Sequence, residues 1–526
     1  MQPLFAPEQP NRRWWRPKSM MTRLVGTLAA LAVIAGIAAC AHGEPAATAS
    51  ADVTASADVT VSVAAPGASG TGVGTGVANA AGTAIGATAF GGHGRLAFVS
   101  SGRLFVLDGT APGRPAALHP VSAANAPTGK TPTANRPTAN TPGSPAWSPD
   151  GRWLAFLVGP SSADGAVTSG ALWLAGPDGQ GAHQVLANVA GFAWSPKADE
   201  AAATSGDGGK LFAVRPGKPT YPMLEVPGQF DGAPAWSPNG REVAVASVGL
   251  TAAKRFASSV IDLFVPSEGV VVNSLASSRA NALIVDGWWA DGEGVLAWSD
   301  PRDAATAPTG GLPLVSYPLG DGPTATLAST PADPAFAVPD GAGVTLVTGG
   351  NRYPWSAETI TYCGVAGHCG PAPGGLPAPV NLDPASSQWR GEPDLAFAHC
   401  ATEPTKATGT TGTAKTTAGV SPQDLSAWYQ TCRLWYAGGV GGSAVPITRA
   451  GAGVAAPTWS ATDGDLLYVR DDSLWLIPMR QPSGALSTAP ALRVVGRLFV
   501  GSGPNADGRT AWQSQFAWHS QPSAAP

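Results

Sequence analysis

Pro145-Ala146-Trp147-Ser148-Pro149-Asp150-Gly151 is the stretch of sequence that decides the fold. Its second proline presets the backbone angle φ for a tight turn, the aspartate follows, and the glycine supplies a left-handed residue. An apolar run, Trp153-Leu154-Ala155-Phe156-Leu157, comes directly afterwards. Because the order is strand, turn, strand, this stretch predicts a β-hairpin.

The hairpin pattern recurs along the chain. Ala193-Trp194-Ser195-Pro196 and Pro234-Ala235-Trp236-Ser237-Pro238-Asn239-Gly240 are close copies, and weaker copies lie at Trp288–Gly292 and Pro457–Gly464. A second motif, Leu followed by Phe or Trp, alternates with the first. It occurs at Leu104-Phe105, Leu172-Trp173, Leu211-Phe212, Leu263-Phe264, Leu434-Trp435 and Leu474-Trp475. Two interleaved motifs at a period of roughly 40 to 50 residues predict repeated four-stranded units.

These turns resemble those of the TolB-like (WD40-like) β-propeller lipoproteins of the bacterial envelope, whose blades carry Trp-Ser-Pro-Asp-Gly between their first two strands. The resemblance covers most of residues 91–526 and implies an all-β fold with a single propeller. Degenerate copies at Pro334–Ala337 and Gln388–Trp389 give eight blades, with seven as the alternative. TolB proteins carry an α/β domain before the propeller, and this chain does not, so no role in the Tol machinery is implied.

The two ends of the repeat region complement each other. Gln515-Phe516-Ala517-Trp518 has the sequence of a first strand but lacks the chain to finish a blade, whereas the region from Arg95 to Asp108 begins at a second strand. Pairing the two would remove two exposed sheet edges. We therefore expect the C-terminal strand to complete the first blade.

Two polar, turn-rich segments interrupt the repeats, at about 122–144 and 401–422, and are expected to be surface loops. Residues 40–90 consist almost wholly of Ala, Gly, Thr, Ser and Val. Such a composition cannot bury a core. We interpret it as a flexible stalk before the propeller.

The N-terminus has the features of an export signal. Arg12, Arg13, Arg16, Lys18 and Arg23 precede an uncharged apolar run, Leu24–Ala39, that is too short to span a membrane comfortably. Its end, Ile37-Ala38-Ala39-Cys40, resembles a lipobox, which implies cleavage after residue 39 and lipidation of Cys40. Two or more acyl chains give stable membrane binding. The expected location is the extracytoplasmic face of the cell membrane.

Composition restricts the possible partners and chemistry. The net charge is −4 and the folded part contains no cluster of Lys and Arg, so we expect no nucleic-acid partner. No Gly-x-Ser-x-Gly nucleophile elbow is present. The seven histidines show no metal-ligand spacing: His42, His93, His119, His183, His368, His399 and His519. We expect no catalytic residues, metal or cofactor.

Four cysteines lie in the repeat region. Cys400 follows a second-strand run and Cys432 precedes a third-strand run of the same blade, so a disulfide between them is expected at the base of the 401–422 insert. Cys363 and Cys369 form a second expected disulfide. With His368 they could instead form a metal clip, but an exported chain favours the disulfide.

Two functions from different classes are consistent with these features. The first is a non-enzymatic, monomeric binding or scaffold lipoprotein whose propeller faces engage an envelope protein or glycan. The second is an envelope hydrolase or lyase with its site in the propeller channel. Because every recurring residue has a structural role, we favour the binding protein.

Overall fold

The computed structural model describes residues 86–520 with gaps, of which the longest are 122–139, 302–310, 372–381, 401–426, 480–488 and 499–510. All of these described residues belong to one compact unit. The predicted signal sequence and Cys40 therefore lie outside the described residues. Within the described part, no helix is long and apolar enough to cross a membrane.

The described residues form seven antiparallel sheets. The first sheet contains β1 (Gly94–Ser100), β2 (Arg103–Gly109), β3 (Ala117–Pro120) and β32 (Phe516–His519). The second contains β4 (Thr141–Trp147), β5 (Leu154–Gly159), β6 (Gly170–Ala175), β7 (His183–Trp194), β8 (Ala201–Ser205), β9 (Lys210–Val214) and β10 (Tyr221–Glu225). The third contains β11 (Gln229–Phe230), β12 (Ala235–Trp236), β13 (Val243–Leu250), β14 (Phe256–Val265) and β15 (Val270–Ser278).

Four four-stranded sheets complete the domain. They contain β16 (Asn281–Trp288), β17 (Gly294–Pro301), β18 (Leu312–Pro318) and β19 (Ala325–Thr330); β20 (Ala337–Asp340), β21 (Gly343–Gly349), β22 (Glu358–Gly364) and β23 (Cys369–Pro371); β24 (Leu382–Trp389), β25 (Glu392–His399), β26 (Arg433–Gly438) and β27 (Val445–Pro446); and β28 (Val454–Trp459), β29 (Asp465–Arg470), β30 (Ser473–Pro478) and β31 (Leu492–Val495). The 3-10 helices η1 (Ala87–Phe90) and η3 (Trp512–Ser514) flank the strands.

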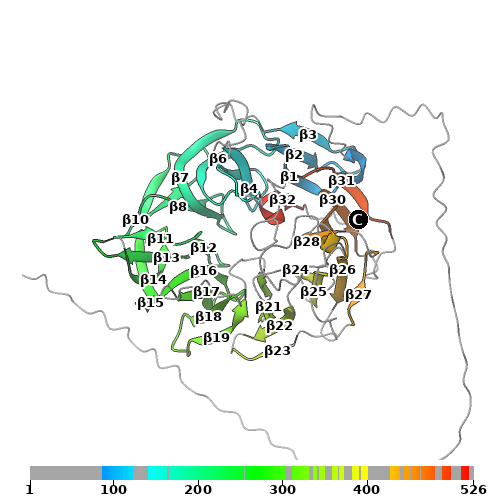
Figure 1. Cartoon of the computed structure of the whole chain (residues 1–526). Coiled ribbons are helices and arrows are strands. Elements are labelled where there is room, and N and C mark those ends of the chain that lie inside the picture. The colour runs from blue at the N-terminus through cyan, green and yellow to red at the C-terminus, as the bar shows by residue number, and fades with distance from the viewer. Residues whose placement is uncertain are drawn as a thin grey trace, which may run out of the picture. The chain divides into compact units, whose positions relative to one another are not determined.

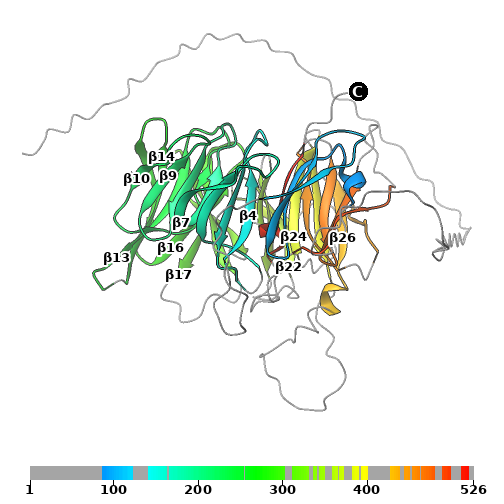
Figure 2. The ribbon, with the colours of Figure 1, turned by 90° about the horizontal axis from the view of Figure 1, so that it is seen from above.

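The sheets follow one another around a common centre in a propeller-like arrangement (Figure 1). The first strand of each four-stranded unit lies innermost (Figure 1). Each innermost strand contacts the next one in the order β32, β4, β7, β12, β16, β20, β24 and β28. The outer strands β3, β10, β15, β19, β23 and β27 lie at the periphery (Figure 1). Figure 2 shows that the strands run across the thickness of the domain.

Both sequence motifs occupy the strands assigned to them. Trp147 ends the inner strand β4, and the turn after it leads into β5. The Leu-Phe and Leu-Trp pairs lie on third strands, as in β2, β6, β9, β14, β26 and β30. The weakly marked region around 335–380 forms the four-stranded sheet β20 to β23. The predicted insert at 122–144 ends earlier than expected, because β4 begins at Thr141 and continues the ladder with β5.

The hydrophobic core lies between the faces of neighbouring sheets. On β1, Leu96 and Phe98 pack toward the last sheet, whereas Ala97 and Val99 pack toward the second. All four side chains are fully buried. Because alternate residues of a strand face opposite sides, a strand covered on both faces is apolar throughout. This explains the continuous apolar run in the sequence of β1.

The tryptophans at the ends of inner strands connect successive units. Their indole N–H groups donate to the carbonyl oxygen that precedes the corresponding tryptophan of the neighbouring unit: Trp147 to Ala517 at 3.1 Å, Trp194 to Ala146 at 3.1 Å, Trp236 to Ala193 at 3.0 Å and Trp288 to Ala235 at 2.9 Å. A buried indole N–H needs such an acceptor. The repeated tryptophan therefore supplies a hydrogen bond as well as packing.

The C-terminal strand completes the first sheet as expected. In the ladder between β1 and β32, Arg95 is opposite His519, Leu96 opposite Trp518, Ala97 opposite Ala517 and Phe98 opposite Phe516. The N-terminal boundary differs from the expected one at residues 90 and 91. Phe90 is 0% exposed and packs in the core between the first and last sheets. The folded part therefore begins no later than Gly86.

Candidate functional site

The turn between β4 and β5 is held by its own side chains. The Ser148 hydroxyl donates to Asp150 Oδ1 at 2.7 Å and accepts from the Trp153 N–H at 3.0 Å. Asp150 Oδ1 also accepts from the Arg152 N–H at 2.9 Å. Gly151 has φ +66°, a left-handed conformation that favours glycine. Each residue type in the motif therefore has a defined role in the turn.

The corresponding turn between β12 and β13 has the same hydrogen bonds. The Ser237 hydroxyl donates to Asn239 Oδ1 at 2.8 Å, which also accepts from the Arg241 N–H at 2.8 Å. Asparagine thus replaces aspartate without loss of the turn. What it lacks is the negative charge, so the turn at Asp150 differs from its copy in electrostatics rather than in backbone geometry.

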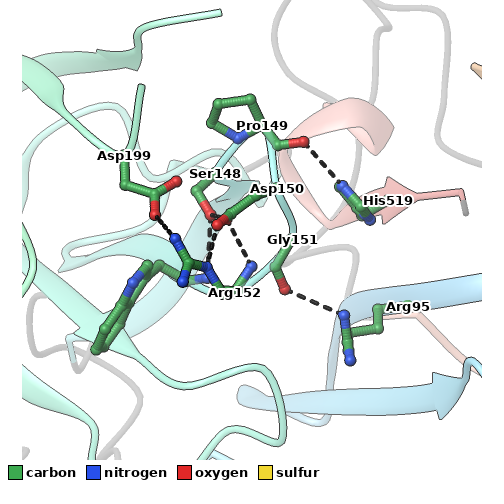
Figure 3. A network of polar contacts seen from close by, with 9 residues as sticks. Arg95, Ser148, Pro149, Asp150, Gly151, Arg152, Asp199 and His519 are labelled. Atoms are coloured by element: carbon green, nitrogen blue, oxygen red, sulfur yellow. Dashed lines mark hydrogen bonds and ion pairs between the residues drawn. The ribbon is translucent and has the colours of Figure 1, made fainter. Parts of the chain in front are cut away.

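Arg152 connects this turn to the next four-stranded unit. Its Nε lies against Asp150 Oδ2, and its Nη2 donates to Asp199 Oδ2 at 2.8 Å (Figure 3). The Arg152 side chain is 71% exposed, whereas those of Asp150 and Asp199 are 33% and 22% exposed. A neighbouring ion pair joins Arg215 to Glu200 at 3.0 Å. The arrangement holds an exposed guanidinium in one place between two carboxylates.

These contacts change the acidity of both carboxyls in opposite directions. Burial opposes ionisation of Asp150, but hydrogen bonds from the Arg152 N–H, the Ser148 hydroxyl and the Arg152 guanidinium outweigh it and lower the pKa of Asp150 to about 2. Burial and the adjacent Asp150 carboxylate raise the pKa of Asp199. Hydrogen bonds to both acids raise the pKa of Arg152. Asp150 therefore stays ionised under all ordinary conditions.

The same turn contacts the first sheet. His519 Nε2 lies 3.2 Å from the Pro149 carbonyl oxygen, and Arg95 Nη1 donates to the Gly151 carbonyl oxygen at 3.3 Å (Figure 3). A Cβ added to Gly151 would lie 2.6 Å from the His519 ring, so the ring packs directly on the glycine. The polar network thus extends across three consecutive four-stranded units, from Arg95 to Asp199.

A contact between a histidine and a carboxylate links the first sheet to the last. His93 Nδ1 lies 2.8 Å from Asp465 Oδ2, and the His93 carbonyl oxygen accepts from the Trp518 indole at 2.7 Å. The Asp465 side chain is 8% exposed. The indoles of Trp147, Trp194, Trp236 and Trp288 donate to carbonyl oxygens of inner strands. The Trp518 indole instead donates to the segment before β1.

The hydroxyl of Ser148 is committed to the turn. Ser148 hydrogen-bonds to a carboxylate, but the residue is 0% exposed and its hydroxyl is used both as donor and as acceptor in the turn. A nucleophile must reach its substrate. Among the described residues no group of three or more His, Cys, Asp or Glu side chains could hold a metal ion.

The cysteines and histidines lie as follows. Cys400 is bonded to Cys432 and Cys363 to Cys369, the two pairings that were expected. Cys400 and Cys432 are 2% and 0% exposed, at the ends of β25 and β26. His368 and His183 are exposed, and His42 and Cys40 lie outside the described residues.

Sequence reasoning missed most of the network. It identified Asp150 as a turn residue, but it predicted neither that Arg152 lies between Asp150 and Asp199 nor that His93 contacts Asp465. These residues come from different units and carry no motif of their own. The available signal was the position of a charged residue directly after the glycine in two copies, Arg152 and Arg241.

Comparisons with known proteins concern the β architecture. No protein-family model and no curated protein matches the chain. The β-propeller domain of the Trilobed protease from Pyrococcus furiosus is 11% identical with a TM-score of 0.36, over 67% of this chain and 97% of that one. For a putative TolB from Agrobacterium tumefaciens the values are 16%, 0.30, 47% and 83%.

An acylaminoacyl peptidase from Pyrococcus horikoshii is 11% identical with a TM-score of 0.37, over 62% of this chain and 49% of that one. This chain therefore spans about half the length of that peptidase.

Proposed function

We propose that the chain is a membrane-anchored, extracytoplasmic binding protein that engages an envelope protein or glycan through the surface around Asp150, Arg152 and Asp199. Its folded part is a closed propeller of eight blades. The blade count is supported by the second sheet, in which β7 serves both as the last strand of β4 to β7 and as the first of β7 to β10. The other six sheets contribute one blade each.

One observation carries the binding proposal: the Arg152 side chain is 71% exposed, and yet its guanidinium is held by two carboxylates. A charged side chain normally loses rotamer freedom when a partner binds, and that loss weakens association. Here much of the ordering is already done in the free protein. Exposed donors and acceptors in fixed positions suit a polar partner surface.

Crosslinking in intact cells tests the proposal. The full chain is crosslinked, purified and compared with Arg152→Ala and Asp199→Ala variants by identification of the captured molecules. Arg241→Ala is the matched control, because Arg241 occupies the equivalent position in a turn where the uncharged Asn239 replaces aspartate. We expect a captured partner that both site variants lose and the control retains.

Two results would overturn the proposal. One is a partner captured equally by all variants, which would place binding elsewhere on the molecule. The other is turnover of a peptide, ester or glycan by the purified chain in a hydrolase screen, with loss of that turnover when channel-lining acids are changed to alanine.

The anchor is tested separately at Cys40. Metabolic labelling with a radioactive fatty acid should label the chain, and Cys40→Ser should abolish the label and release the protein from the membrane fraction. Labelling that survives Cys40→Ser would refute lipidation at this position.

A further inference from the structure

The segment before β1 is built into the junction between the first and last sheets. The Gly86 N–H donates to the Val494 carbonyl oxygen of β31 at 2.9 Å, and the Ala116 N–H donates to the Ala87 carbonyl oxygen at 2.8 Å. Ala116 precedes β3, the outer strand of the first sheet. Residues 86–87 therefore connect the outer strands of two sheets that are far apart in sequence.

Phe90 fills the space behind this connection. It is fully buried with Phe98 and Leu107 of the first sheet and with Leu476 and Val494 of the last. Backbone approaches are close on both sides. An added Cβ would lie 2.1 Å from the Arg493 carbonyl oxygen at Gly86, and 2.1 Å from the Phe90 carbonyl oxygen at Gly109. Only glycine permits these approaches.

The inner side of the same junction is held by the other end of the chain. β32 pairs with β1, and the Ala461 N–H, directly after the last inner strand, donates to the Ser520 hydroxyl oxygen at 2.8 Å. η3, next to β32, contacts both β28 and β4. His93 joins the two sides, because its ring binds Asp465 and its carbonyl oxygen accepts from Trp518.

We propose that Gly86–Phe90 and β32 are the outer and inner halves of one clasp that closes the junction between the first and last sheets. The chain entering the domain at Gly86 is then a structural component of that closure, not a passive linker. A change at Phe90 loosens β1, β31 and β32 together and leaves the opposite side of the ring as it was. This inference stands on contacts within the folded part and is independent of the proposed binding function.

Hydrogen exchange followed by mass spectrometry on the full chain tests the clasp. In Phe90→Ala, amides of β1, β31 and β32 should exchange faster by at least about tenfold, because local opening of the junction becomes easier. Amides of β13, β14 and β15 in the third sheet should keep their rates. Thr88→Ala is the matched control, since Thr88 lies in the same short helix but is exposed.

Phe90→Leu serves if Phe90→Ala fails to fold. It keeps an apolar side chain and should raise exchange in the same three strands to a smaller extent. Faster exchange confined to residues 86–93 would show that the segment only packs against a junction closed by other contacts. An equal increase in β13 to β15 would show general destabilisation. Either result overturns the clasp.

Discussion

Two junctions between neighbouring units of this domain are made in opposite ways. Between the second and third units the backbone is continuous, because β7 runs for 12 residues as the last strand of one and the first of the next. Between the last and first units the junction depends on β32, Gly86–Phe90 and His93, which are brought together from both ends of the chain. The first junction cannot open without breaking a sheet, whereas the second can open by releasing side chains and one short ladder.

The difference indicates where the domain opens first. Two strands joined by a short connection pair again at a small entropic cost after they separate. Pairing between segments that are distant in sequence closes a long loop and costs more conformational entropy. We therefore expect the free energy of local opening to be lowest at the junction of the first and last sheets and high at β7.

The largest expected effect follows from removal of Ser514–Pro526. This deletion takes away β32 and the Ala517 carbonyl oxygen that accepts from Trp147, and it exposes the edge of β1. The melting temperature measured by calorimetry should fall sharply. Removal of residues 521–526 alone, which lie outside the described residues, is the control and should leave it close to that of the full chain. An unchanged melting curve after the larger deletion would refute the closure.

The Cys400–Cys432 disulfide lies away from both junctions, so the stability lost on its removal can be compared with the stability lost at the junctions. Replacement of Cys400 and Cys432 by alanine opens a loop with a sequence separation of 32. On the chain-entropy model the loss is about 3 to 4 kcal/mol, measured by urea unfolding. The same change at Cys363 and Cys369, with a separation of 6, should lose less, at about 2 kcal/mol. A peptide map of the wild-type chain that joins Cys363 to Cys432 would contradict both expectations.

A matched pair of tryptophan variants compares the two junctions directly. Trp194→Phe removes a 3.1 Å bond to Ala146 within the continuous sheet, and Trp518→Phe removes a 2.7 Å bond to His93 at the junction of the ends. Each should lower the free energy of unfolding by about 1 kcal/mol. Only Trp518→Phe should also speed exchange in β1 and β31. Equal exchange in the two variants would show that the junctions are equally strong.

The smallest expected effect concerns acid stability. The pKa of Asp150 in the folded protein, about 2, lies below its ordinary value of 3.8, so its ionised form stabilises the fold above that value and the contribution is lost as the pH falls toward 2. Arg152→Gln should raise the pKa of Asp150, measured by NMR titration, and lower the free energy of unfolding above about pH 4, with the difference from the wild-type chain shrinking to zero as the pH falls toward about 2. Arg241→Gln, in the equivalent turn where the uncharged Asn239 replaces aspartate, should leave the pH profile unchanged. A pKa of Asp150 that does not move in Arg152→Gln would show that the turn alone sets it.

Local patterns accounted for much of the architecture. Turn chemistry and strand alternation act over a few residues, so they can be predicted from the sequence. They gave the Trp147 and Trp236 turns, the Leu-Trp third strands and the pairing of β32 with β1. The Cys400–Cys432 pair could be predicted for the same reason, since these cysteines flank neighbouring strands of one sheet.

The candidate site and the first residue of the folded domain could not be predicted from local sequence patterns. Arg152 and Asp199 meet only because two units lie side by side, and no spacing in the sequence encodes that meeting. Phe90 is a single apolar residue at the end of a low-complexity run, where composition indicates a stalk. Its burial depends on β31, which follows about 400 residues later.

The pairing of β1 with β32 also determines the order in which the molecule can be completed. β1 is among the first strands to be synthesised, and its inner partner is the last, so every intermediate length of chain carries an unpaired apolar edge. Contacts between such distant segments form slowly. The first sheet therefore cannot be completed until residues 516–519 have been synthesised.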